Sequence, residues 1–291
     1  MPVRGLVAAC HPLPCLAVTA FAGCWSAGIG LSSGRVVLVM VAVLLGQLSV
    51  GWSNDWVDAG RDAVARRQDK PITAGLVGRR TVGAAAASAA LACVVASLAL
   101  GWAAGGVHVL AVASAWAYNL GLKSTAVSPL PYALSFGLLP AVATWAGSKP
   151  GWPGPGVTLG AALLGVAAHF ANTVPDVAAD AATGVRGLPQ RLGPRRSLQV
   201  MAWFVAGAAA SLFLARGRVG GHDAGAATVH GGAGTGWSGL GWSGQVALAV
   251  LVAGAALAAA VALVGERAGD RAFRMTLVAV ALVVAGFLIP A

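Results

Sequence analysis

The sequence contains very few charged residues for its length. Of its 291 residues, 10% are Asp, Glu, Lys or Arg, whereas 58% are hydrophobic. Soluble domains usually carry about 25% charged residues, which they need to cover a water-facing surface. The mean hydropathy of +0.79 lies on the apolar side as well. These values exclude an ordinary soluble globular protein and indicate a polytopic membrane protein.

Cysteine is also scarce, and basic residues form no continuous stripe. The four cysteines are Cys10, Cys15, Cys24 and Cys93. They include no C-x-x-C pair, so we interpret them as small apolar residues rather than as disulfide partners or metal ligands. The net charge of +10 is spread over short segments between apolar runs. Without a basic stripe interleaved with aromatic residues, we expect membrane lipid around the chain and no nucleic-acid partner.

Nine apolar segments qualify as membrane-crossing helices. They cover residues 8–30, 36–53, 81–103, 106–121, 129–147, 158–175, 198–215, 244–264 and 273–290. Because His11, Pro12 and Pro14 interrupt the apolar core that a signal peptide needs, we expect the first segment to be retained as a membrane helix. The connecting loops leave no room for a soluble domain. The sequence predicts an all-α fold of nine transmembrane helices in one bundle, a single domain over residues 1–291.

Lys and Arg are distributed unevenly between the two sides of this bundle. If the N-terminus is cytoplasmic, fifteen of the 19 basic residues fall on the cytoplasmic side. Cytoplasmic loops of membrane proteins carry such an excess of Lys and Arg. We therefore expect a multi-pass protein of the plasma membrane whose loops 54–80 and 172–197 face the cytoplasm. The loop 216–243 is rich in Gly, Ser and Ala, and we expect it to be flexible and on the outer side.

Six of the nine acidic residues gather in two of the cytoplasmic segments. They are Asp55, Asp58, Asp62 and Asp69 in the first segment, and Asp176 and Asp180 in the second. If the second apolar helix continues, the first three acids stand at i, i+3 and i+7 and share one face. The two acids of the second segment stand at i and i+4. We therefore expect each helix end to present a small group of carboxylates.

Carboxylates that lie so close together repel each other, and burial strengthens the repulsion. Arg61 or Lys70 could neutralise them locally. A hard divalent cation does so better, because Mg²⁺ prefers carboxylate and amide oxygens and often bridges them to phosphate oxygens. Ordinary loop charges remain an alternative for each cluster alone. Two clusters on one side favour a site for a diphosphate carried on Mg²⁺.

Basic residues accompany both clusters. Arg66, Arg67 and Lys70 follow the first cluster, and Arg186 and Arg191 follow the second. Lys123 stands alone at the cytoplasmic end of the fourth apolar segment, five residues after Tyr118. A diphosphate leaving group needs such cations to spread its charge. We interpret the remaining flanking arginines as topology determinants, namely Arg79, Arg80, Arg195 and Arg196.

At these residues the sequence resembles the UbiA superfamily of intramembrane prenyltransferases. The first family motif, N-D-x-x-D-x-x-x-D, is matched by Asn54, Asp55, Asp58 and Asp62, and is followed by Lys70-Pro71 and Gly75. The second motif, D-x-x-x-D, is matched by Asp176 and Asp180, and is followed by Gly184, Leu188-Pro189 and Leu192-Gly193. Family members have nine membrane helices, with the motifs after the second and sixth, where the segments above place them.

The resemblance implies Mg²⁺-dependent transfer of a prenyl group from a prenyl diphosphate to an aromatic, quinone-precursor-like acceptor or another lipophilic acceptor. The implied metal ligands are Asp55, Asp58, Asp62, Asp176 and Asp180, and Lys123 would help the diphosphate leave. The implied substrate-binding residues are Asn54, Arg61, Arg67, Lys70, Tyr118, Asn172 and Arg186. Aromatic candidates for stabilising an allylic cation are Tyr118, Trp116, Trp145 and Trp56.

The subfamily stays open. Many family members carry an acidic residue three positions before the second motif, where this chain has Thr173. Asn172 resembles the menaquinone-type branch, but the first motif does not, so the acceptor is not assigned.

Two other classes are alternatives. A transporter could use carboxylates at the cytoplasmic face, but a carrier should place charge near the membrane midplane. The spans are almost free of charge, and we interpret His108 and His169 in them as structural hydrogen-bonding residues. Another Mg²⁺-dependent lipid transferase, such as a CDP-alcohol phosphotransferase, would hold its acidic motif in a single stretch. This chain divides its acids between residues 55–62 and 176–180.

Overall fold

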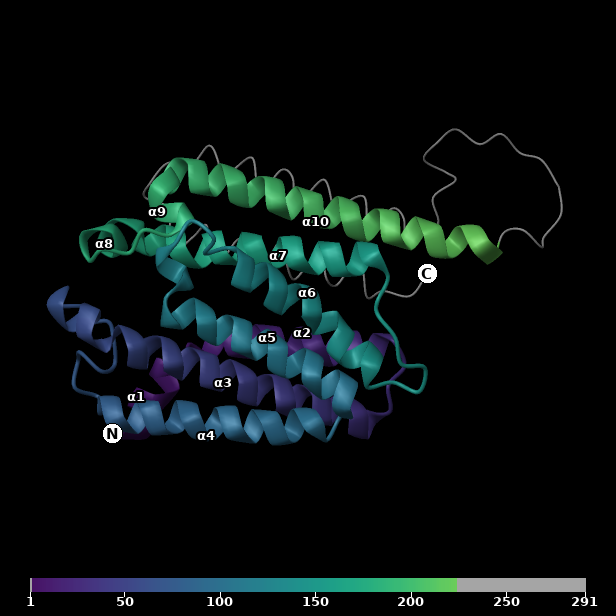
Figure 1. Cartoon of the computed structure of the whole chain (residues 1–291), viewed down its shortest axis with the longest axis horizontal. Helices are drawn as coiled ribbons and strands as arrows, with labels where there is room; N and C mark the ends of the chain where they lie inside the picture. The colour runs from purple at the N-terminus through teal and green to yellow at the C-terminus, as the bar shows by residue number, and fades with distance from the viewer. Residues whose placement is uncertain (1, 224–291) are drawn as a thin grey trace.

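A computed structural model describes residues 2–223, and each regular element within this range is a helix (Figure 1). The α-helices are α1 (Pro2–Ala9), α2 (Pro12–Gly28), α3 (Ser33–Val64), α4 (Arg79–Leu98), α5 (Trp102–Leu120), α6 (Leu130–Trp145), α7 (Pro155–Thr173), α8 (Val177–Ala182), α9 (Leu188–Leu192) and α10 (Pro194–Asp223). Two short 3-10 helices are η1 (Leu122–Ser124) and η2 (Val174–Asp176). The all-α prediction is confirmed for the described residues.

Six of the seven spans predicted within residues 2–223 each correspond to one helix with shifted ends, and the first corresponds to two helices. By length and apolar composition, three helical segments in this range are able to cross a membrane: Ser33–Val64, Arg79–Leu98 and Pro155–Asp176. Helices α1 and α2 form a further, bent candidate. The predicted spans 244–264 and 273–290 lie outside the described residues. The described residues thus show an all-helical membrane fold, and the predicted number of nine transmembrane helices stays a prediction.

The first predicted span, 8–30, differs from the structure. The chain forms two helices there, α1 and α2, which are bent by 64° relative to each other. His11 lies between them with a left-handed φ of 54°. A residue before proline is disfavoured in the right-handed helical region, and Pro12 follows directly. The break places His11 beside the C-terminal part of α3, where its ring contacts Asp55.

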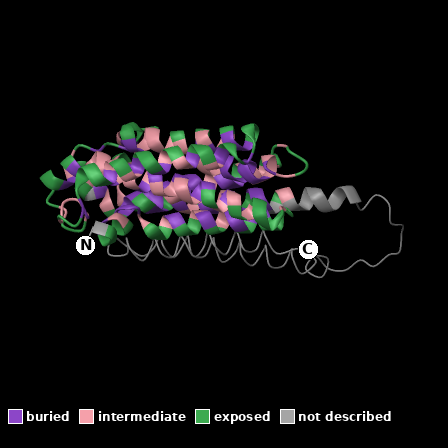
Figure 2. Ribbon diagram, turned by 90° about the horizontal axis from the view of Figure 1, so that it is seen from below, coloured by how far each residue is buried: buried purple, intermediate pink, exposed green. Residues whose placement is uncertain are grey.

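The long helices pack side by side as a bundle (Figure 1). Helix α3 contacts α2, α4 and α5, while α6 contacts α5 and α7, and α7 contacts α10. Figure 2 shows buried and half-buried residues along the interior, and exposed residues along the outer surface and at the ends. Small residues allow the close contacts: a Cβ on Gly165 would collide with the carbonyl of Tyr132. This agrees with the role of Ala and Gly in membrane helix packing.

Three helix boundaries differ from the predicted ones and affect the site. Helix α3 runs through Val64, beyond the predicted 36–53, so the first acidic motif lies on the same helix. Helix α7 ends at Thr173, before the second motif. Helix α10 continues through Asp223, so the loop predicted from residue 216 begins no earlier than 224.

Candidate functional site

The first acidic motif occupies the last turns of α3. Asp55 is 2% exposed and Asp62 is 8% exposed, so both carboxylates are buried at the end of the bundle. One oxygen of Asp55, Oδ1, accepts a hydrogen bond from Lys70 Nζ at 3.1 Å and lies 3.1 Å from His11 Nε2. The other oxygen, Oδ2, is buried and has no hydrogen-bond partner in the described part of the chain. A buried carboxylate oxygen without a partner is available to a further ligand.

Asp58 binds two cations from different elements. Lys123 Nζ lies 2.6 Å from both carboxylate oxygens of Asp58, and Arg61 also donates to Asp58. Lys123 belongs to η1 and is buried. Burial lowers the pKa of Lys123, although the charge of Asp58 acts in the opposite direction. The structure therefore joins the lysine after α5 to the central acid of the first motif.

The loop after α3 turns back over the acidic face. Arg66 and Gly75 adopt positive φ angles of 52° and 71° at its turns. Although burial opposes it, the charge of Asp55 raises the pKa of Lys70, which stays protonated. Asp62 makes no ion pair within the described range, but Lys70 is its electrostatic neighbour. The loop thus supplies a cation to both buried acids.

Arg67, in the same loop, connects the two motifs. Its Nη2 lies 2.7 Å from Asp69 Oδ2 and 3.2 Å from Asp176 Oδ1. The hydrogen bond from Arg67 lowers the pKa of Asp69. The same bond, followed by the charge of Asp176, raises the pKa of Arg67. Residues that are more than a hundred positions apart are therefore held together at one end of the bundle.

The second motif does not lie on one continuous α-helix, contrary to the prediction. Pro175 lacks an N–H group and its ring clashes with the preceding turn, so α7 cannot continue through it. Asp176 instead ends η2 and precedes α8, and Asp180 lies within α8. Gln190 Nε2 donates to Asp180 Oδ2 at 2.9 Å. Burial, followed by repulsion from Asp176, raises the pKa of Asp180.

The two motifs approach each other around Lys123. Asp58 and Lys123 are both electrostatic neighbours of Asp180, while Lys123 holds Asp58 directly. The backbone around Lys123 is also packed tightly, because a Cβ on Gly187 would collide with its carbonyl oxygen. The chain therefore gathers carboxylates and cations from α3, η1 and α8 in one region.

Asn54 is held by a residue that sequence reasoning missed. Its Nδ2 donates to Asn119 Oδ1 at 3.1 Å. Buried Asn119 donates in turn to Ser53 Oγ and to the carbonyl of Val50. A lone Asn near the end of the fourth apolar segment is the signal that could have indicated it.

His11 and Gln190 were also missed as partners of acids. His11 had been noted only as an interruption of an apolar run. Gln190 lies inside the Leu-Pro to Leu-Gly stretch that follows the second motif. Neither residue carries a charge pattern of its own, so only the fold reveals its contact.

The predicted aromatic residue Tyr118 belongs to a ring cluster in which Tyr118 and Tyr132 are half-buried and His169 is buried. Its ring centroid lies 5.1 Å from Tyr132 and 5.5 Å from His169. Asn172 Nδ2 donates to the hydroxyl of Tyr132 at 3.3 Å. His169 Nε2 lies 3.1 Å from Ser128 Oγ. Tyr118 of α5 and Asn172 of α7 thus have a common neighbour, Tyr132.

Other candidates lie elsewhere. Arg186 is exposed and makes no ion pair within residues 2–223. Trp116 donates to Ser49, Trp145 contacts Trp152, and Trp56 lies under Arg79. His108 is hydrogen-bonded to Ser97 at 2.7 Å, in keeping with a structural role.

The acids are paired mainly with cations of the chain itself. Within the described residues, no group of three or more His, Cys, Asp or Glu is arranged to hold a metal ion. The donor type nevertheless suits a hard cation, because carboxylate oxygens predominate and Asp55 Oδ2 is free of partners. The arrangement can bind an anion through Lys123 and Arg67 or a divalent cation through the acids.

Comparison with solved structures shows a shared fold over almost the whole chain. A UbiA homologue from Aeropyrum pernix K1 has a TM-score of 0.69 at 17% identity, and covers 93% of this chain and 96% of its own. A structure of digeranylgeranylglyceryl phosphate synthase has a TM-score of 0.68 at 14% identity, with 98% and 97% covered. A UbiA homologue from Archaeoglobus fulgidus bound to GPP and Mg²⁺ has a TM-score of 0.65 at 13% identity, with 98% and 100% covered.

Sequence comparison gives the family directly. A search of curated proteins finds no match. Residues 16–283, however, match the UbiA prenyltransferase family. This match covers far more than half of the chain and includes both acidic motifs. The chain is therefore a membrane protein that belongs to the UbiA prenyltransferase family.

Proposed function

We propose that this protein transfers a prenyl group from a prenyl diphosphate to an aromatic, quinone-precursor-like acceptor or another lipophilic acceptor within the membrane. The observation that carries the proposal is the approach of the two acidic motifs around Lys123. Membership of the family supports it. The Archaeoglobus fulgidus homologue in structures with GPP or DMAPP and Mg²⁺ supports the same substrate class.

The chain's own cations would bind the diphosphate. Lys123 and Arg67 each lie at an acid that a metal ion would otherwise neutralise. When a diphosphate enters, these side chains are placed to spread the charge that develops on the leaving oxygens. Lys70 and Arg61 would support the same charge from the α3 side. Arg186 remains a proposed contact of the substrate on the α8 side.

Mg²⁺ fits the acidic residues, which would be Asp55, Asp58, Asp62, Asp176 and Asp180. Bound there, the metal would supply neutralisation of the diphosphate oxygens. Asp55 would use its unpartnered Oδ2, while Asn54 is oriented by Asn119. The raised pKa of Asp180 would fall on metal binding, because a cation favours the ionised carboxyl.

The half-buried rings of Tyr118 and Tyr132 would face the reacting prenyl group. Their negative faces can stabilise a developing allylic cation. Exclusion of water by this apolar region would protect the cation from hydrolysis. Asn172, bonded to Tyr132, would orient this wall of the site.

We further propose that the whole chain, residues 1–291, acts as one multi-pass domain of nine helices in the plasma membrane. The excess of Lys and Arg in the motif-bearing loops supports a cytoplasmic N-terminus and a cytoplasmic site. Cysteine accessibility in intact cells tests this orientation. Labelling of a cysteine at position 68 from the outside would contradict it.

The reaction itself is tested with purified protein in lipid. Diphosphate release is measured over a panel of radiolabelled prenyl diphosphates and acceptors, with and without Mg²⁺. Wild type should release diphosphate only with Mg²⁺, and Asp58→Ala and Asp180→Ala should each reduce release by at least about a hundredfold. Asp69→Asn, in the loop that follows α3, is the control and should retain most of the activity.

Two outcomes have different meanings. Product formed from one acceptor would name the substrate class. No binding of any prenyl diphosphate, even at high Mg²⁺, would refute the proposal and bring the transporter alternative forward.

A further inference from the structure

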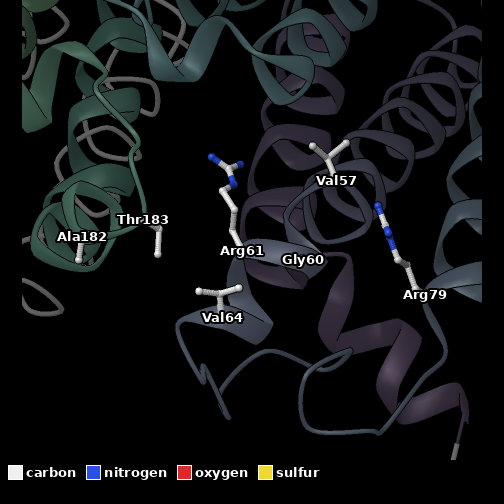
Figure 3. A pocket seen from close by; sticks show the side chains of 7 residues that line it. All are labelled: Val57, Gly60, Arg61, Val64, Arg79, Ala182 and Thr183. Atoms are coloured by element: carbon white, nitrogen blue, oxygen red, sulfur yellow. The ribbon is translucent and has the colours of Figure 1, made fainter.

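A cleft of about 570 Å³ lies beside the last turns of α3 (Figure 3). Val57, Arg61 and Val64 of α3 form one wall, Arg79 at the start of α4 lies at one side, and the end of α8 forms the other side. Sites for small molecules commonly measure about 300–1,000 Å³. The cleft is therefore large enough for a headgroup-sized ligand.

The cleft occupies a different face of α3 from the acidic motif. Val57, Arg61 and Val64 follow helical spacing and share one face. Val57 comes two residues after Asp55, which corresponds to about 200° of rotation around the helix. Arg61 stands at the border, because it lines the cleft and its guanidinium donates to Asp58. The cleft is thus a neighbour of the proposed diphosphate site and is separate from it.

Its charged lining is entirely basic. Arg61 and Arg79 contribute the charges, and none of the residues that line the cleft is acidic. Arg79 Nε donates to the carbonyl of Trp56 at 3.1 Å, and its guanidinium lies 6.0 Å from the Trp56 ring. Gly83 allows this packing, since a Cβ there would lie 2.7 Å from Trp56 Nε1. Arg79 is therefore held in place, yet no acid among residues 2–223 pairs with it.

Apart from Gly60 and the polar Thr183, the rest of the lining is apolar. Val57, Val64 and Ala182 contribute hydrocarbon to the cleft, and Val64 is 81% exposed. A free inorganic anion would gain nothing from these walls, whereas an amphiphile would use both them and the arginines. Basic pockets between membrane helices bind anionic lipid headgroups for this reason.

We propose that this cleft binds the phosphate headgroup of an anionic membrane phospholipid. The phosphate lies at Arg79, whose guanidinium has no acidic partner among residues 2–223, and the glycerol region lies against Val57 and Val64. The sequence interpretation of Arg79 as a topology determinant does not explain its fixed position over Trp56. Lipid binding is measured without prenyl transfer, so its outcome is separate from that of the proposed reaction.

The experiment titrates the full-length protein in detergent with phosphatidylglycerol or phosphatidylcholine and counts bound lipid by native mass spectrometry. Wild type should bind phosphatidylglycerol more tightly than phosphatidylcholine. Arg79→Gln should weaken this binding about fivefold, the change expected for one basic residue beside an anionic lipid. Arg80→Gln removes the same charge one position away, outside the cleft, and should leave the dissociation constant nearly unchanged.

A second pair of variants covers the case in which Arg79→Gln misfolds. Val64→Glu and Val64→Gln have the same size at an exposed position, so only the charge differs. The Glu variant should bind phosphatidylglycerol about fivefold more weakly than the Gln variant. Equal binding by these two, or equal losses in the two arginine variants, would overturn the site. Competition by inorganic phosphate as strong as by lipid would overturn phospholipid as the occupant.

Discussion

In the first acidic motif, Asp55 and Asp62 lie on one unbroken helix and are 2% and 8% exposed. In the second, the side chain of Asp176 is 40% exposed and follows a helix that ends at Thr173. The first set of carboxylates is thus fixed by the bundle, whereas the second is positioned by a broken helix and by contacts from elsewhere. Two motifs of similar sequence are therefore not equally preorganised in this protein.

The largest expected effect concerns the residue that joins both motifs. Replacing Lys123 with Met removes the cation that holds Asp58 at 2.6 Å. If the proposed chemistry is right, kcat should fall by about 10²–10³-fold, as when a preorganised electrostatic donor is lost. Steady-state kinetics with saturating prenyl diphosphate provides the measurement. A fall confined to KM would show that Lys123 serves binding alone.

The next largest expected effect is on the free energy of unfolding, which should fall more on loss of an acid from the first motif than from the second. Asp55→Ala leaves Lys70, whose side chain is only 15% exposed, without its ion-pair partner, which should cost about 3–5 kcal/mol. Asp176→Ala breaks a pair with Arg67 that is more exposed and should cost about 1 kcal/mol or less. Denaturant unfolding in mixed micelles measures both. Equal losses would contradict the assignment of a fixed first motif and a looser second one.

Removing the break at Pro175 should place the second motif on a continuous helix, as the first motif is on α3. In Pro175→Ala the backbone regains an N–H, so α7 can continue and rotate Asp176 away from Arg67. Misplacement on this scale should lower kcat by about 10²-fold. Pro155→Ala is the control, because a proline in the first turn of α7 interrupts no hydrogen bond. Unchanged activity in Pro175→Ala would show that the break is not needed.

A smaller effect is expected at the missed residue Asn119. Asn119→Ala leaves Asn54 Nδ2 without its partner at the end of α3, whereas the carbonyl of Val50 keeps the hydroxyl of Ser53 as a donor. Loss of a buried hydrogen-bond partner costs about 1–3 kcal/mol. Thermal unfolding measures the loss, and Asn119→Leu distinguishes volume from hydrogen bonding. If both variants are as stable as wild type, the Asn54–Asn119 contact does not support the first motif.

The smallest expected effect depends on pH. The hydrogen bond from Arg67 lowers the pKa of Asp69 in the folded protein. Its stabilisation is therefore present above the unfolded pKa and is lost as the pH falls through the folded pKa. Because Asp69 is 62% exposed, the contribution should stay below about 1 kcal/mol. Asp69→Asn should lower Tm slightly at pH 7 and by less at pH 3; an equal shift at both values would exclude the ion pair.

Much of the fold within the described residues was predictable from hydrophobic runs. Apolar segments of sufficient length become helices because lipid offers no partners to the backbone. The shared face of Asp55, Asp58 and Asp62 followed from helical spacing, and α3 provides the continuous helix that this required. The ends were harder, since polar residues such as Asp62 continue a helix that the hydrophobic pattern alone would end at residue 53.

The proposed site was only partly predictable. Lys123 was singled out because it is an isolated cation at a helix end, and its contact with Asp58 agrees with that reasoning. His11, Asn119 and Gln190 gave no signal of comparable strength, because an uncharged polar residue is common in loops and helix ends. Their importance depends on which distant residue they meet.

The sequence by itself determined that the protein lies in a membrane and which side chains could act as ligands. Its lack of charge required a membrane, and its two Asp-rich segments identified the donors that suit a divalent cation. Only the tertiary structure decided which side chains meet: Arg67 with Asp176, Lys123 with Asp58, and His11 with Asp55. The reason is physical, because ion pairing depends on distances across the bundle. Those distances follow from helix packing and from breaks such as the one at Pro175, which spacing along the chain does not encode.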